Sequence, residues 1–149
     1  MTFTLEKLRD SIAGVLKKNY PDIPVYGNPN QQGTKTPCFF VFFMPSDMER
    51  EIDRRARRVI GVDVVYLTRR NNSNTHDQLI TVADLLDEVM ERVSYTDGVE
   101  STELWTSERE WKIDDGELHY QFTVKAIVSS PSNVPPIESM ESYAGNIKN

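Results

Sequence analysis

Residues 38–44 form an uninterrupted apolar run, and this run constrains the fold of the chain more than any other feature. Successive side chains of an extended strand point to opposite sides. The two sets are Phe39, Val41 and Phe43 on one face and Cys38, Phe40, Phe42 and Met44 on the other. A strand without apolar–polar alternation is predicted to be covered by other elements on both of its faces.

Two segments have the apolar period of a helix. Residues 3–19 repeat apolar side chains every three or four positions, and Pro21 ends the segment. Residues 75–94 do the same and open on a capping box of Thr75 and Gln78. Two helices cover one face of a sheet, so we expect a second copy of the chain to cover the other face.

The remaining periodic segments are predicted strands. Residues 23–27 form a short edge strand, and residues 59–67 are β-branched and aromatic. Residues 103–113 and 117–128 form a hairpin around the Asp-Asp-Gly turn at 114–116. The order predicts an α+β domain over residues 1–128, with a mostly antiparallel sheet of four to five strands and two helices on one face. Residues 129–149 have no apolar period and are predicted to be a disordered tail or an extended C-terminal arm that orders against a neighbour.

Composition excludes several classes of protein. A net charge of -6 over 149 residues argues against a dedicated nucleic-acid binder. The single cysteine cannot form an internal disulfide, and no signal peptide is recognisable at the N-terminus. No apolar stretch approaches the ~20 residues that cross a bilayer. We therefore expect a soluble protein of the reducing cytoplasm with no membrane partner.

Residues able to carry chemistry are few and scattered. His76 and His119 lack the spacing of metal ligands, so both are interpreted as surface residues. Cys38 lies in an aromatic run, where burial raises the pKa of a thiol and makes it unreactive. No phosphate-binding glycine motif or nucleophile elbow occurs. The expectation is a protein with no catalytic residue, no metal and no cofactor.

An arginine-rich segment, residues 49–58, stands out in this acidic chain. It holds five arginines against three acids, among them Arg54, Arg55, Arg57 and Arg58. Arginine's planar fork suits contact with phosphate or with an acidic partner surface. The alternative is a solvated hairpin in which the arginines pair with neighbouring acids, and the sequence leaves both readings open.

Two tryptophans stand on an otherwise polar strand. Trp105 and Trp111 are six residues apart, so a regular strand places both on one face. Tryptophan is enriched in protein–protein contacts because it buries a large area with few rotatable bonds. We interpret Trp105 as an interface residue and Trp111 as closing the core of its own protomer.

Three patterns in the chain resemble small tail proteins of Gram-positive phages and prophage-derived particles. They are the Lys-x-Pro-Cys-Phe-Phe run at 35–40, the Arg57-Arg58 pair with the alternating apolar residues up to Tyr66, and the Asp-Gly-Glu-Leu-His-Tyr hairpin at 115–120. The family is the tail terminator or tail completion proteins, mostly of contractile-tailed phages. The resemblance covers roughly residues 5–128 and includes no catalytic signature.

The resemblance implies a ring, usually of six subunits, that caps the tail tube and presents a surface to the head connector. It also implies contact with the tube protein, possible contact with the sheath, and a place at the head-proximal end of the virion after assembly in the host cytoplasm. DNA would pass through the lumen without specific binding. A head–tail connector or neck protein is the alternative within this class, and a small nucleic-acid-binding module is a further one.

Ten residues are the expected contacts in such an assembly. They are Phe40, Phe42, Arg54, Arg55, Arg57, Arg58, Trp105, Pro135, Pro136 and Ile137.

Deletion of the residues after Ser130 is expected to leave the fold intact and to weaken assembly. The Pro-rich composition there supports neither a helix nor an interior strand, so the arm has little to contribute to the core. Circular dichroism reports the fold and light scattering the oligomer. Unchanged oligomer formation by the truncated chain would show that the arm is dispensable.

Overall fold

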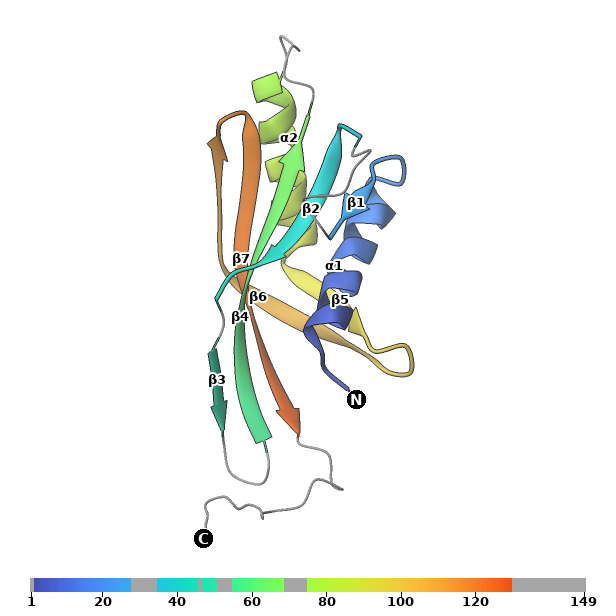
Figure 1. Ribbon diagram of the computed structural model, residues 1–149, viewed down its shortest axis with the longest axis vertical. Helices are drawn as coiled ribbons and strands as arrows, with labels where there is room; N and C mark the ends of the chain where they lie inside the picture. The colour runs from blue at the N-terminus through green and yellow to red at the C-terminus, as the bar shows by residue number, and fades with distance from the viewer. Residues whose placement is uncertain (1, 28–34, 46, 51–54, 69–74, 130–149) are drawn as a thin grey trace, which may run out of the picture.

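The computed structural model describes residues 2–27, 35–45, 47–50, 55–68 and 75–129. Two helices and seven strands lie within these ranges (Figure 1). In chain order they are α1 (Leu5–Asn19), β1 (Val25–Tyr26), β2 (Cys38–Phe43), β3 (Asp47–Arg50), β4 (Arg55–Leu67), α2 (Thr75–Val89), β5 (Arg92–Thr96), β6 (Ser101–Asp114) and β7 (Glu117–Ser129).

The strands form one mostly antiparallel sheet in the order β1-β2-β4-β7-β6-β5, with β3 paired to β4 beside this path. Only the β1–β2 pairing is parallel among the described strands. The predicted α+β class is confirmed. The sheet has more strands than the four to five expected, because β3 and β5 were not foreseen as strands.

The second helix is shorter than the sequence predicted. It ends at Val89, and the chain continues as β5 instead of remaining helical to residue 94. Val93 follows Met90 by three positions and therefore fits a helical stripe, yet it alternates with Tyr95 as a strand does. Val93 and Tyr95 are both fully buried, and pairing of β5 with β6 satisfies their backbone groups. Val93 thus fits both a helical and a strand period, and its burial in the core determines that the segment is a strand.

Other boundaries moved by a few residues. The first helix begins at Leu5 instead of residue 3, because the Thr4 hydroxyl accepts a hydrogen bond from the Lys7 N–H at 3.1 Å and caps it there. β4 begins at Arg55 instead of residue 59, since its first residues pair with β3. β6 begins at Ser101 instead of residue 103.

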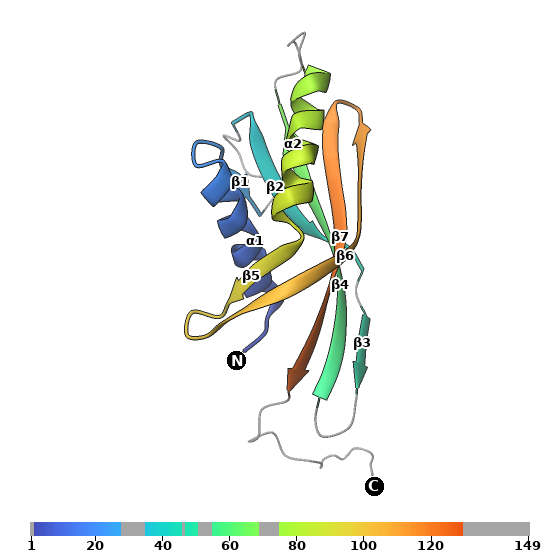
Figure 2. The same ribbon diagram turned by 180° about the vertical axis from the view of Figure 1, so that it is seen from behind.

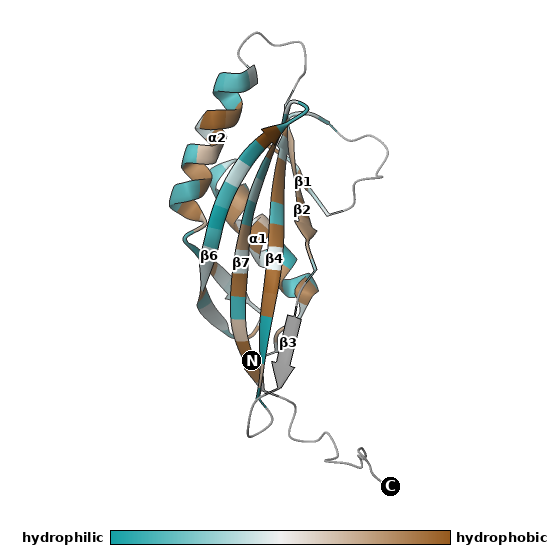
Figure 3. Ribbon diagram, turned by 90° about the vertical axis from the view of Figure 1, so that its left-hand side faces the viewer, coloured by the Kyte–Doolittle hydropathy of each residue, from teal (hydrophilic) through white to brown (hydrophobic). Residues whose placement is uncertain are grey.

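Both helices pack on one face of the sheet, as predicted (Figure 2). Each helix buries one apolar stripe, and the same core contains alternate residues of β2, β4 and β7. Figure 3 looks onto the sheet with β4, β6 and β7 in front of α1. The fully buried residues of the two stripes are Leu8, Ile12, Leu16, Leu79, Ala83 and Leu86.

The second face of β2 departs from expectation. Cys38, Phe40 and Val65 form a small buried cluster there, with Tyr26 and Phe42 packed against it. Phe40 is only 5% exposed in the single protomer. The expectation that another copy must cover Phe40 is therefore wrong. Phe42 is half-buried and lies at the rim of this cluster.

Two phenylalanines of β2 offer a matched test of the two faces. Phe39 is fully buried in the main core, whereas Phe42 is half-buried on the opposite face. Phe39→Ala should lower the free energy of unfolding by about 3–5 kcal/mol, because it removes a packed ring and leaves a cavity. Phe42→Ala should cost clearly less. Urea unfolding of both variants measures the difference, and equal losses would contradict the assignment of faces.

Candidate subunit interface

The sheet divides into two limbs at β6. Residues of β6 from Thr106 onward pair with β7, whereas residues 101–105 pair with β5. Beyond Val124, β7 pairs only with β4 among the described strands. We call residues 91–105 the hairpin limb, and residues 55–59 with 125–129 the ribbon limb. Figures 1 and 2 show the two limbs diverging below α2, with the hairpin limb running beside the lower part of α1.

A β-bulge in β6 lies next to this division. The register shifts between Ser107 and Glu110, where three steps along β6 match two along β7, and Glu108 adopts a positive φ of 54°. One extra residue reverses which side chains face the core. Trp111 pairs with buried Tyr120 on the helix side, while Trp105 precedes Thr106, the partner of buried Val124. The prediction that both tryptophans share a face is therefore wrong.

Trp105 lies on the outer face of the hairpin limb and is 62% exposed. The Arg92 guanidinium lies 5.3 Å from the centre of its ring, as a cation–π contact. Glu91, Glu108 and Arg109 line the same shallow recess of about 270 Å³. Sequence reasoning missed Arg92 because it placed this residue in the second helix. Trp111 is 42% exposed, so it closes the core of its protomer only partly.

The arginine-rich segment spans the adjoining ends of β3 and β4, which pair in antiparallel register as the strands of a hairpin do. Pairing of its arginines with neighbouring acids stays a prediction. Arg55 is exposed, whereas Arg57 and Arg58 are half-buried. The Arg58 guanidinium lies 5.5 Å from the ring centre of Phe3. Contact of these arginines with a partner stays a prediction. Arg54, Pro135, Pro136 and Ile137 lie outside the described residues.

The outer face of the ribbon limb includes an exposed apolar residue that was not predicted as a contact from the sequence. Ile127 is 62% exposed and pairs across the strands with Arg57. The alternation of β7 identified Ala126 and Val128 as inward, and it left Ile127 outward by default. An exposed isoleucine in a strand interior was the available signal.

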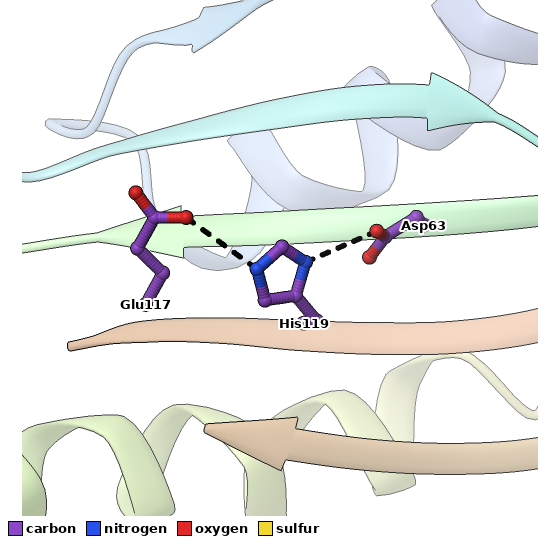
Figure 4. Close-up of polar contacts among 3 residues, drawn as sticks. All are labelled: Asp63, Glu117 and His119. Carbon is purple, nitrogen blue, oxygen red and sulfur yellow. Dashed lines mark hydrogen bonds and ion pairs between the residues drawn. The ribbon is translucent and has the colours of Figure 1, made fainter. Parts of the chain in front are cut away.

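A polar contact joins β4 to β7 on the same outer face (Figure 4). His119 Nδ1 lies 3.1 Å from Asp63 Oδ2, and His119 Nε2 lies 3.4 Å from Glu117 Oε1. Both ring nitrogens of His119 therefore face carboxylate oxygens of neighbouring side chains. His119 is thus a residue of the sheet surface, as predicted, and it holds the middle of this face polar.

The described residues contain no grouping of three or more metal-ligating side chains. Neither described helix is long and apolar enough to cross a membrane.

Comparison with known proteins identifies the family. A family model described as phage tail terminator protein matches residues 7–136, which is most of the chain. The chain therefore belongs to the phage tail terminator family and is a structural component of a phage virion, a class that associates with other tail proteins. The match extends past residue 128, where the sequence analysis ended the domain. Comparison with curated proteins gives no match.

The tip of the hairpin limb is organised by Asp97. Its carboxylate accepts hydrogen bonds from the N–H groups of Glu100 at 2.8 Å, Thr2 at 2.7 Å and Val99 at 2.9 Å. These bonds, that from Glu100 most of all, hold the pKa of Asp97 well below its ordinary value of 3.8. One side chain thereby fixes the turn and ties the N-terminus to it.

Asp97→Asn should destabilise the chain in a pH-dependent way. A carboxyl whose pKa is lowered by folding stabilises the native state above its unfolded pKa, and this contribution is lost as pH falls. The stability gap between wild type and variant should be full at pH 7 and should narrow below about pH 4. Urea unfolding across this range measures it, with exposed Asp84→Asn as the control. A gap that does not change with pH would contradict the assignment.

Proposed function

We propose that this protein forms a ring that caps the tail tube, ends tube polymerisation and provides the surface that joins the head connector. Family membership over residues 7–136 supports a place in the tail. The observation that carries the ring is the presence of an exposed apolar residue on each limb, Trp105 and Ile127. Two different surfaces on one chain suit a heterologous contact, which closes into a ring when the rotation permits.

The proposed ring is a homohexamer at the head-proximal end of the virion, assembled in the host cytoplasm. Its partners are the tail tube protein, the head–tail connector or neck protein, and the sheath where the tail is contractile. The arm containing Pro135, Pro136 and Ile137 is proposed to contribute to these contacts. This proposal extends the resemblance stated from sequence and rests on family membership.

DNA is proposed to cross the ring without specific binding. The chain has a net charge of -6, and acidic walls repel phosphate groups. Arg58 is engaged with Phe3 in its own protomer, which speaks against an arginine surface devoted to nucleic acid. Nucleic-acid binding by residues 50–58 would instead show as strongly salt-dependent affinity for DNA.

Particles that lack this protein test the proposal. If the protein ends polymerisation, its deletion should give tails of irregular, excessive length without heads, and supply of the wild-type chain from a plasmid should restore normal tails. Electron microscopy of lysates measures tail length and head attachment. Tails of normal length that lack heads would contradict termination and would favour the connector or neck reading.

Light scattering and negative-stain images of the purified chain test ring formation separately. Rings should appear alone or after addition of tail tubes. A chain that stays monomeric in both conditions, with no density at tube ends, would contradict the proposed ring.

A further inference from the structure

We propose that the two limbs are the two halves of the contact between subunits: the ribbon limb of one copy docks on the outer face of the hairpin limb of the next copy. This inference rests on the proposed function, namely that copies of the chain close into a ring. It adds which surfaces meet and the sign of the charge that each presents.

The ribbon limb presents an apolar centre among cations. Ile127 follows Lys125 by two residues along β7 and lies opposite Arg57 on β4, so these three residues share the outer face. Arg55 lies on this face as well, and Arg55 and Lys125 are exposed. Residues 55–61 of β4 and 123–129 of β7 include no acidic residue. Asp47 and Glu49 of β3, opposite Val59 and Arg57, are the two acids that the described register brings to this region, and Arg50 is the cation of the same strand.

The hairpin limb presents an apolar centre among anions. Trp105 is exposed, and Glu103 lies two residues before it on the same face of the strand. Glu91 and Glu108 line the recess beside its ring together with Arg109, and Arg92 lies over the ring itself. Residues 91–105 contain four acids and one arginine, a formal charge of −3. This surface is therefore opposite in sign to the ribbon limb.

The charges of the two limbs indicate which molecule binds to them. Two ribbon limbs would repel each other, as would two hairpin limbs, so a symmetric contact between like surfaces is disfavoured. A ribbon limb meeting a hairpin limb pairs opposite charges around two apolar centres, and it leaves a free limb of each kind to bind further copies. A second copy of this chain therefore supplies, for each limb, a surface of opposite charge with an apolar centre.

The N-terminal segment holds the limbs in a fixed relation. The Phe3 ring stacks on Tyr95 of β5 with 5.0 Å between ring centres, and the Arg58 guanidinium lies 5.5 Å from the same ring. Phe3 thus contacts both limbs. A fixed angle between the two contact surfaces favours closure into a ring of one size over open chains.

Charge reversal tests the contact. The first variant of the full chain, Arg55→Glu with Lys125→Glu, makes the outer face of the ribbon limb acidic, because Arg57 is then the one cation left beside Ile127 among the described residues. The second, Glu91→Lys with Glu108→Lys, makes the recess beside Trp105 basic, because Arg92 and Arg109 already lie there. All four side chains are exposed, so both variants should fold as wild type does by circular dichroism. Each variant alone should require about tenfold or more protein to assemble, because like charges then face each other.

Two combinations should restore assembly. A chain carrying all four substitutions again has limbs of opposite sign, and it should assemble near the wild-type concentration. An equimolar mixture of the two variants should also assemble, with the variants alternating around the ring. Asp84→Lys with Glu88→Lys on α2, and Lys17→Glu with Lys18→Glu on α1, are the controls of equal charge change and should assemble as wild type does.

The outcomes separate this inference from the proposed function. Rings that form equally well from both variants would overturn the assignment of the limbs and leave the ring standing. Loss of assembly that neither the fourfold variant nor the mixture restores would also overturn it. Failure of the wild-type chain to form rings, on tubes or alone, would instead overturn the proposed function.

Discussion

The antiparallel pairing of β4 with β7 is the interaction on which the rest of the structure depends. All 13 residues of β4 have a partner in β7. This register places Ile60, Val62 and Val64 beside Val124, Phe122 and Tyr120, and so creates one continuous apolar surface for both helices. The same register brings His119 to Asp63 on the opposite face. The pairing of β4 with β7 thus defines an apolar, helix-covered face and a polar face of the sheet.

The paired strands are longer than the layer of helices that covers them. Beyond Ile60 toward its N-terminus, β4 continues with β3 and β7 as an extension, whereas β5 packs on α1 and diverges from this extension with the first part of β6 (Figure 1). Open strand edges and exposed apolar side chains invite association with another chain. In a tail protein this surplus of strand is consistent with assembly.

Much of the fold could be predicted because the responsible signals are local. Helical period, the Asp114–Gly116 turn and the two-faced run at 38–44 gave the elements and the helix-covered face. What failed depended on contacts distant in sequence: Val93 satisfied two periods at once, and the cover of Phe40 came from Val65 and its neighbours. Of the expected contact residues, Trp105 is exposed as anticipated, while Ile127 and Arg92 were missed because single positions carry no periodic signal.

The bulge between Ser107 and Glu110 uncouples the two ends of one long strand. Without the additional residue, the pleat would carry Trp105 into the interior and turn Leu104 out to solvent. Natural variants that shorten or lengthen this stretch by one position would therefore exchange the inside and the outside of the whole hairpin in a single step. Sequence comparison within the family should find this spacing held constant even where the flanking side chains vary.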